Sequence, residues 1–190
     1  RARLRELLPQ SLAAGPTVAV FGYGSNGIEQ LRERCQNPAL TADAATLPDH
    51  VRCFAGWSRR RAGAVASVVP SPGDVVHGTL VWLSEPELLL LDGFEGVDAT
   101  DPFSASGVYR RHNVTCYLRD GTRQPGIMYV KNDLTWRGPP SADYLDLCLA
   151  HVTTAWPDVC PWSIEVRDGD ARLQFTYPPY PLVQGSGGRG

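Results

Sequence analysis

The hydrophobic pattern near the start of the chain predicts a strand, a polar loop and a helix in direct succession. Residues 17–21 form a short apolar run of the length expected for a buried strand. The following residues 22–26, "GYGSN", offer almost no hydrophobic side chain to a core. Asn26, with Glu29 three residues later, resembles a capping box and predicts that a helix begins there. Apolar side chains then recur at helical spacing, at Ile28, Leu31 and Cys35.

The middle of the chain has the pattern of an antiparallel meander. Strand-like segments are predicted at 51–57, 63–69 and 76–83. Between the last two lies "SPGD", residues 71–74, whose Pro, Gly and Asp favour a turn. The pattern therefore predicts three short strands joined by turns.

A second helix is predicted directly after this meander. Ser84 and Glu87 have the spacing of a capping box, and Pro86 lies within the first turn. The apolar run 88–91 follows, and Gly93 is the expected end of the helix. Small and polar residues at 98–107 then predict a loop.

A hairpin is predicted in the second half of the chain. The segments 108–118 and 123–130 flank Asp120-Gly121, a strong signal for a tight turn between two strands. Pro125 has no N–H to give to a sheet, so we expect a bulge or an edge position there. Ser141 is the expected cap of a last helix, whose apolar stripe is formed by Leu145, Cys148, Val152 and Ala155.

These elements predict one α+β domain with a small mixed or antiparallel, barrel-like β-sheet and short flanking helices. We place this domain at residues 17–160, after a lead-in at 1–16 that is helical or disordered. A hairpin-like piece at 167–170 lies in the Pro- and Gly-rich extension 161–190, which we expect to be partly flexible.

Composition narrows the class of function. The chain has 190 residues and a formal net charge of -2, so it lacks the basic excess of a nucleic-acid-binding protein. No apolar run approaches the roughly 18 residues of a membrane span. The histidines and cysteines show no metal-binding spacing, and the odd number of dispersed cysteines favours a reducing, cytoplasmic compartment over a disulfide framework. The cysteines are Cys35, Cys53, Cys116, Cys148 and Cys160.

The 22–26 loop is the first candidate for chemistry, and spacing alone leaves two interpretations open. It is either an ordinary turn or an anion-binding pocket, because glycines let a ligand approach backbone N–H groups beside the start of a helix. No Gly-Lys-Ser/Thr follows, so it is not a phosphate-binding P-loop.

Glu95, in "FEGV", is the second candidate. It is either a solvated loop residue or a partly buried carboxylate suited to proton transfer. Tyr109, Tyr129 and Tyr144 are either pocket residues or half-buried core residues. We interpret the run Arg59-Arg60-Arg61 as a solvated strand edge rather than an anion patch.

Taken in order, several motifs make the sequence similar to the γ-glutamylcyclotransferase family. They are "FGYGSN", "SPGDVVHGTLVWLSEPELLLLDGFEGV", "YRRHNV", "GIMYV" and "PPSADY", spread over most of residues 18–157. The resemblance implies that Glu95 is the proton-transferring residue and that Tyr144 contacts the substrate, with Tyr109 and Tyr129 as further pocket residues. It also implies a substrate loop made of Val20, Phe21, Gly22, Tyr23, Gly24, Ser25 and Asn26.

The resemblance implies a small-molecule γ-glutamyl substrate, which cyclises to 5-oxoproline and releases an amino acid, without a metal or organic cofactor. The "YGSN" form is closer to enzymes of γ-glutamyl amino acids than to those of glutathione or γ-glutamylamines. Two alternatives stay open: a related enzyme acting on a modified metabolite or isopeptide, and a non-catalytic binding module of the same fold. The sequence does not indicate an oligomeric state.

Overall fold

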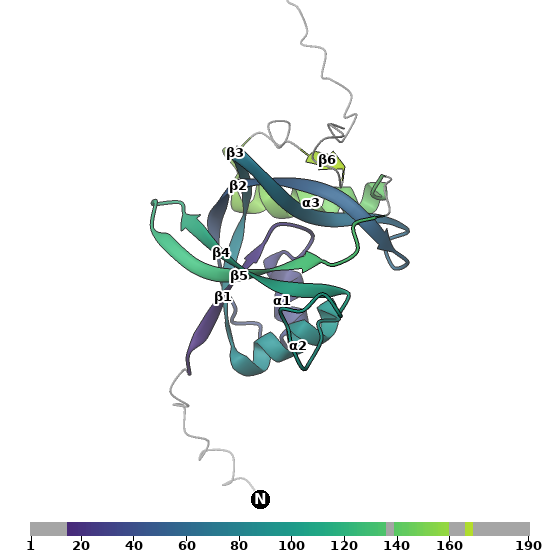
Figure 1. Cartoon of the computed structure of the whole chain (residues 1–190). Helices are drawn as coiled ribbons and strands as arrows, with labels where there is room; N and C mark the ends of the chain where they lie inside the picture. Colours follow the sequence, from purple (N-terminus) through teal and green to yellow (C-terminus); the bar gives the residue numbers. More distant parts are fainter. Residues whose placement is uncertain (1–14, 136–138, 160–165, 169–190) are drawn as a thin grey trace, which may run out of the picture.

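A computed structural model describes residues 15–135, 139–159 and 166–168 of the chain (Figure 1). Strands make up a larger share of the described part than helices do, and α1, α2 and α3 lie outside the curved sheet. In chain order the elements are β1 (Thr17–Gly22), α1 (Ile28–Arg34), β2 (Ala42–Ser58), β3 (Gly63–Ser84), α2 (Glu85–Glu95), β4 (Tyr109–Leu118), β5 (Arg123–Lys131), α3 (Ala142–Ala155) and β6 (Val166–Asp168).

The sheet closes on itself. Its strands follow the order β3-β1-β5-β4-β2, and β2 pairs again with β3, so five strands form a closed barrel. Most neighbours are antiparallel, whereas β1 runs parallel to β5. Strand β6 pairs in parallel with β2. The predicted α+β fold with a mixed, barrel-like sheet is therefore confirmed.

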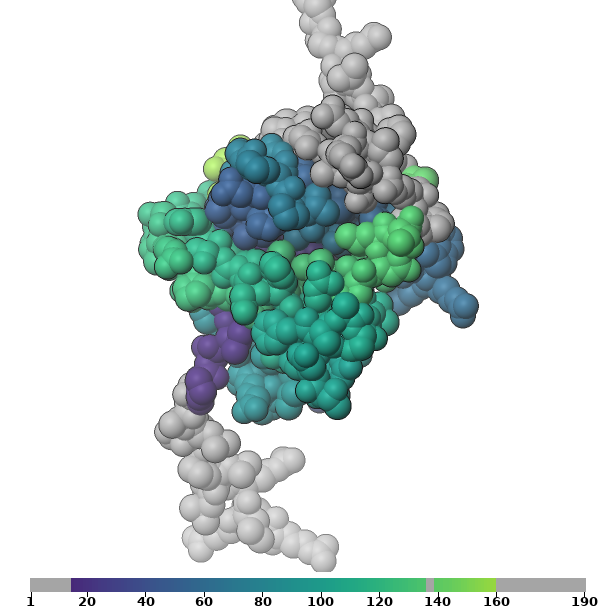
Figure 2. Space-filling view, viewed as in Figure 1, coloured from purple at the N-terminus to yellow at the C-terminus, as the bar shows by residue number. Residues whose placement is uncertain are grey.

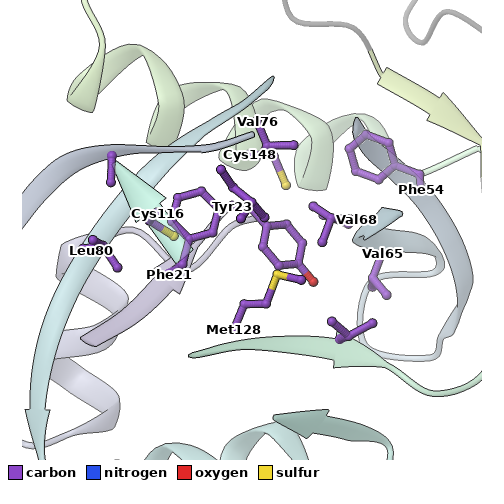
Figure 3. Close-up of a cluster of buried hydrophobic side chains, with 14 of the residues drawn as sticks. Phe21, Tyr23, Phe54, Val65, Val68, Val76, Leu80, Cys116, Met128 and Cys148 are labelled. Carbon is purple, nitrogen blue, oxygen red and sulfur yellow. The ribbon is translucent and has the colours of Figure 1, made fainter. Parts of the chain in front are cut away.

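The position of β1 between two hydrophobic clusters explains why its sequence is apolar and does not alternate with polar residues. Its two faces pack into two different hydrophobic clusters: Phe21 belongs to the cluster inside the barrel, and Val20 to the cluster that α1 and α2 cover. A strand buried on both faces has no polar face to show. Figure 3 shows Phe21 of this strand and Tyr23, one residue past its end, among the inward-pointing side chains, with Cys148 of α3 beside them.

The predicted three-strand meander is wrong, because β2 and β3 form one long hairpin. The "SPGD" residues 71–74 do not reverse the chain but lie inside the continuous strand β3. Gly73 takes a positive φ of 86°, and its N–H donates to Asp49, opposite a register shift in β2. The turn residues thus produce an irregularity within the pair. The hairpin crosses the molecule and ends in a tip at residues 59–62, at the right of Figure 1 and among the blue atoms at the right of Figure 2.

Two helix boundaries differ from the prediction. Gly27, and not Asn26, is the N-cap of α1, because the Asn26 amide is engaged elsewhere. The capping box of α2 between Ser84 and Glu87 is confirmed. That helix continues past Gly93 to Glu95, since Gly96 adopts the left-handed conformation, at φ 65°, that ends a helix.

The predicted hairpin around Asp120-Gly121 is confirmed as β4 and β5. The bulge expected at Pro125 is wrong: Pro125 pairs with Thr115 in unbroken register, and β5 is not an edge strand. Strand β5 pairs with β1 at Ile127, two residues beyond Pro125. The missing N–H of Pro125 therefore removes no hydrogen bond to β1. The helix capped at Ser141 is confirmed as α3.

The lead-in 1–14 and most of the extension from residue 160 lie outside the described residues, as does the second half of the hairpin-like piece at 167–170. Within the described part, no helix has the length and apolar character needed to cross a membrane.

Candidate active site

One pocket of about 170 Å³ opens where the β1–α1 loop, the end of α2 and the start of α3 meet. All the residues that we predicted for the site line it: Val20, Phe21, Gly22, Tyr23, Gly24, Ser25, Asn26, Glu95, Tyr109, Tyr129 and Tyr144. They come from β1, the β1–α1 loop, α2, β4, β5 and α3, so closure of the barrel brings them together. Phe21 is a core residue at the same time, with only 2% of its surface exposed.

Glu95 lies at the last residue of α2, with about a tenth of its side chain exposed. Asn26 Nδ2 donates a hydrogen bond of 2.9 Å to Glu95 Oε1, and Arg34 Nη1 donates one of 2.8 Å to the same oxygen. Arg34 also donates to Asn26 Oδ1 at 3.2 Å. Oε1 is therefore fixed by two donors, while Oε2 has no hydrogen-bond partner among the described residues.

The backbone of the β1–α1 loop approaches its neighbours closely. A Cβ on Gly24 would lie 3.2 Å from Ala66 Cβ and 3.6 Å from the Tyr144 hydroxyl. In the described chain no acceptor takes the N–H groups of Gly24, Ser25 and Asn26, so they remain available to a ligand. Glycine is needed here because a side chain would narrow the pocket floor.

His151 of α3 supports this loop from behind. Its Nδ1 lies 2.6 Å from the Gly24 carbonyl oxygen, and its Nε2 lies 2.9 Å from Thr79 Oγ1. A carbonyl only accepts, so Nδ1 carries the proton and Nε2 accepts from the threonine hydroxyl. Desolvation by burial lowers the pKa of His151, which keeps the ring neutral and this arrangement intact. Sequence reasoning missed His151, because the contact joins residues 127 positions apart.

Four tyrosines give the pocket neutral hydroxyl groups. Burial raises the pKa of Tyr23, Tyr109, Tyr129 and Tyr144. Tyr23 donates to the Tyr129 carbonyl at 2.6 Å, and the Ala66 N–H donates to the Tyr144 hydroxyl at 3.1 Å. The Tyr109 hydroxyl has no hydrogen-bond partner within the described chain.

A network beneath the pocket fixes the end of α2 to the sheet. Asp92, one turn before Glu95, accepts from the Tyr129 hydroxyl at 2.8 Å and forms a two-bond ion pair with Arg111. Arg111 comes from β4 and Tyr129 from β5, so two strands hold the helix that carries Glu95. Such anchoring is what a positioned reactive group requires.

Three arginines that the sequence analysis did not assign to the site also line the pocket. Arg34 lies on α1, and Arg60 and Arg61 lie on the tip of the β2–β3 hairpin. The prediction that residues 59–61 form a strand edge is wrong, because they lie in the turn of the hairpin; Arg59 and Arg60 are exposed, as predicted, and Arg60 and Arg61 also line the pocket. We call residues 20–26, Arg34 and Glu95 the inner wall, and Arg60 and Arg61 the rim.

The donor set does not suit a metal ion. Across the described ranges, no group of three or more His, Cys, Asp or Glu side chains is placed to hold one. Charge in the pocket comes from arginines and one carboxylate.

A concave pocket lined largely by apolar and aromatic side chains, with a few convergent polar groups that include one anchored carboxylate, is typical of a site for small molecules. The sequence pattern of the family described as "Gamma-glutamyl cyclotransferase, AIG2-like" matches residues 20–146. The chain therefore belongs to this γ-glutamylcyclotransferase family, as its motifs indicated.

Individual proteins of known sequence or structure also resemble this chain. A mouse (Mus musculus) γ-glutamylcyclotransferase is 30% identical over 135 residues, which cover 68% of this chain and 67% of the relative. A solved structure of a γ-glutamyl cyclotransferase superposes with a TM-score of 0.64 at 25% identity, over 74% of this chain and 80% of that one. A structure of an uncharacterised human protein gives 0.64 at 26% identity, over 74% and 81%.

Proposed function

We propose that this protein is a γ-glutamylcyclotransferase in which Glu95 moves protons while the loop 20–26 holds the γ-glutamyl group. One observation carries the proposal: Glu95 is fixed through Oε1 beside a loop that lines the same pocket and whose Gly24, Ser25 and Asn26 N–H groups have no acceptor in the described chain. A carboxylate held on one oxygen keeps the other for the substrate. We further propose that residues 17–160 form the catalytic domain.

The reaction is an aminolysis within one substrate molecule. The α-amine attacks the γ-carbonyl carbon, a C–N bond forms to give 5-oxoproline, and the bond to the leaving nitrogen breaks. An α-ammonium cannot attack, so Glu95 takes one of its protons first and then returns that proton to the leaving nitrogen. The attacking nitrogen loses a second proton as the lactam forms, and the released amine takes up a proton to become an ammonium, so atoms and charge balance without electron transfer.

Holding the substrate in a folded shape supplies much of the acceleration. Because both reacting groups belong to one molecule, correct orientation can contribute on the order of 7–11 kcal/mol. The N–H groups of Gly24, Ser25 and Asn26 are suited to the α-carboxylate of the substrate or to the oxyanion that develops on its γ-carbonyl. The hydroxyl of Tyr109, which also lines the pocket, is available as a further hydrogen-bond donor to the substrate.

Release of 5-oxoproline by the purified protein tests the proposal. The substrates are γ-glutamyl-alanine, glutathione and a γ-glutamylamine, each at the same concentration, with and without a chelator. We expect turnover of γ-glutamyl-alanine that the chelator leaves unchanged. Absence of 5-oxoproline from every substrate would instead support a binding module of this fold.

A further inference from the structure

The rim differs from the inner wall because its arginines have no acidic partner among the described residues. Arg34 pairs with Glu95, Arg111 with Asp92 and Arg119 with Asp158. Among the described residues no carboxylate lies within ion-pair distance of Arg60 or Arg61, although both line the pocket. Unpaired arginines at a pocket mouth are ready to bind an anion.

Charge counting over the pocket lining points the same way. The lining contains three arginines, Arg34, Arg60 and Arg61, and one carboxylate, Glu95, which leaves two positive charges in excess. Burial keeps the pocket tyrosines neutral, so they do not compensate. A γ-glutamyl group carries one ammonium and one carboxylate that cancel each other, and therefore cannot balance this excess by itself.

The rim is held in place and is directed at the pocket. The Arg61 guanidinium carbon lies 4.9 Å from the ring centroid of Tyr144, a buried residue of the pocket. At the base of the tip, the Ala64 N–H donates to the Pro139 carbonyl at 3.2 Å. A Cβ on Gly63 would lie 2.8 Å from the Ser141 nitrogen, so the hairpin packs tightly against the start of α3. Stacking restricts the Arg61 guanidinium, and packing of the tip against α3 restricts the backbone that carries Arg60.

We propose that Arg60 and Arg61 form a subsite for the carboxylate of the leaving group. This inference rests on the proposed cyclotransferase function and adds to it a substrate class, namely γ-glutamyl compounds whose departing amine bears a carboxylate, as amino acids and peptides do. The inner wall holds the γ-glutamyl part, and the rim binds the second carboxylate on the other side of the scissile bond. Uncharged γ-glutamylamines lack that group and are disfavoured.

A pair of substrates that differ only in this charge tests the subsite. We expect the wild-type kcat/KM for γ-glutamyl-alanine to exceed that for γ-glutamyl-alaninamide by about tenfold, the size of one modest charge-assisted contact. In the double variant Arg60→Gln/Arg61→Gln this preference should fall to less than about threefold, through loss of activity on the carboxylate substrate. Because the rim is exposed, added salt should also weaken the wild-type preference.

Arg59 provides the matched control. It lies in the same turn but does not line the pocket, so Arg59→Gln removes one positive charge from the hairpin and should leave the preference unchanged. An equal loss of activity on both substrates in the double variant, or no preference in the wild type, overturns the subsite.

A binding measurement separates this inference from the proposed function. Calorimetry with Glu95→Gln, alone and combined with the double variant, compares affinity for the acid and the amide without turnover. If no 5-oxoproline forms from any substrate but the acid still binds more tightly through Arg60 and Arg61, the function fails and the subsite stands. If the two compounds bind equally, or neither binds, the subsite fails.

Discussion

The two sides of the pocket are built differently. On the inner wall, Glu95 and Arg34 are about nine-tenths buried, and their contacts run between residues fixed on α1, α2 and the β1–α1 loop. On the rim, Arg60 is exposed and Arg61 half-buried, and neither has an acidic partner in the described chain. The inner wall is preorganised before a ligand arrives, whereas the rim gains its ion-pair partner only from the ligand.

This difference assigns different kinetic consequences to the two sides. Groups that are fixed beside the reacting atoms contribute chiefly to the transition state and therefore to kcat. Exposed charges that contact a remote part of the substrate contribute to its capture and selection, and are screened by salt. Changes on the inner wall should thus lower kcat, and changes on the rim should alter discrimination between substrates.

Glu95→Gln should have the largest effect. The amide keeps the shape of the side chain but cannot accept the ammonium proton, so kcat should fall at least about 100-fold, the lower end for general acid–base catalysis. The measurement is 5-oxoproline release, together with the thermal midpoint of unfolding. Glu85→Gln, an exposed carboxylate at the start of the same helix, is the control and should keep wild-type kcat. Retention of more than about a tenth of wild-type kcat in Glu95→Gln would refute the mechanism.

Asn26→Leu should come next. Loss of the amide removes one of the two donors to Glu95 Oε1 and the acceptor for Arg34. A hydrogen bond to a charged group is worth about 1.5–3 kcal/mol, so kcat should fall by about tenfold or more. Asn37→Leu is a matched control, because Asn37 donates 2.6 Å to the Glu87 carboxylate at the other end of α2. It should lower stability without lowering kcat; if it lowers kcat equally, the contact to Glu95 has no special role.

The free energy of unfolding should depend on pH through His151, whose ring contacts the Gly24 carbonyl behind the inner wall. The pKa of His151 in the folded protein lies below its ordinary value, so the unfolded chain binds this proton more readily. The stabilisation is therefore complete above the unfolded value of about 6.5 and is lost as the pH falls below it, by at most about 1.4 kcal/mol per pH unit. Denaturant unfolding of the wild type at several pH values between about 5 and 8 measures this slope.

His151→Asn isolates the contribution of this residue. Asparagine can still donate to the Gly24 carbonyl but does not titrate, so the slope should become shallower. A remaining slope is expected from His77 and His112, whose pKa values burial also lowers. An unchanged slope in the variant would show that His151 titrates alike in both states.

Gly93→Ala should have the smallest effect. Gly93 lies in α2 away from the pocket, and an added Cβ would meet no atom within 4 Å. Alanine should stabilise the helix by about 0.5–1 kcal/mol and leave kcat unchanged. Gly78→Ala is the opposite case: its Cβ would lie 2.2 Å from the Gly22 carbonyl oxygen, so it should destabilise the fold. Thermal unfolding of both variants checks the contrast, and a destabilised Gly93→Ala would contradict it.

Local sequence signals predicted the elements that carry the inner wall. The apolar run at 17–21, the capping box between Ser84 and Glu87 and the Asp120-Gly121 turn each act over a few residues, and each is present in the structure. Turn and cap residues specify backbone conformation directly, which is why such signals can be recognised without knowing the rest of the fold. The order of the motifs then identified the family, and the site residues that it implies all line one pocket.

The sequence by itself therefore determined the strand, the loop and the helix that place residues 20–26 and Glu95. Only the tertiary structure decided that Asn26 contacts Glu95 instead of capping α1, that Arg34 shares the same oxygen, and that Arg60 and Arg61 reach the mouth of the pocket. These contacts join residues brought together when the barrel closes, such as Arg34 and Glu95, 61 positions apart. Whether an arginine faces bulk solvent or a ligand pocket depends on which elements pack against each other in the folded chain. The local pattern of polar and apolar residues does not contain this information.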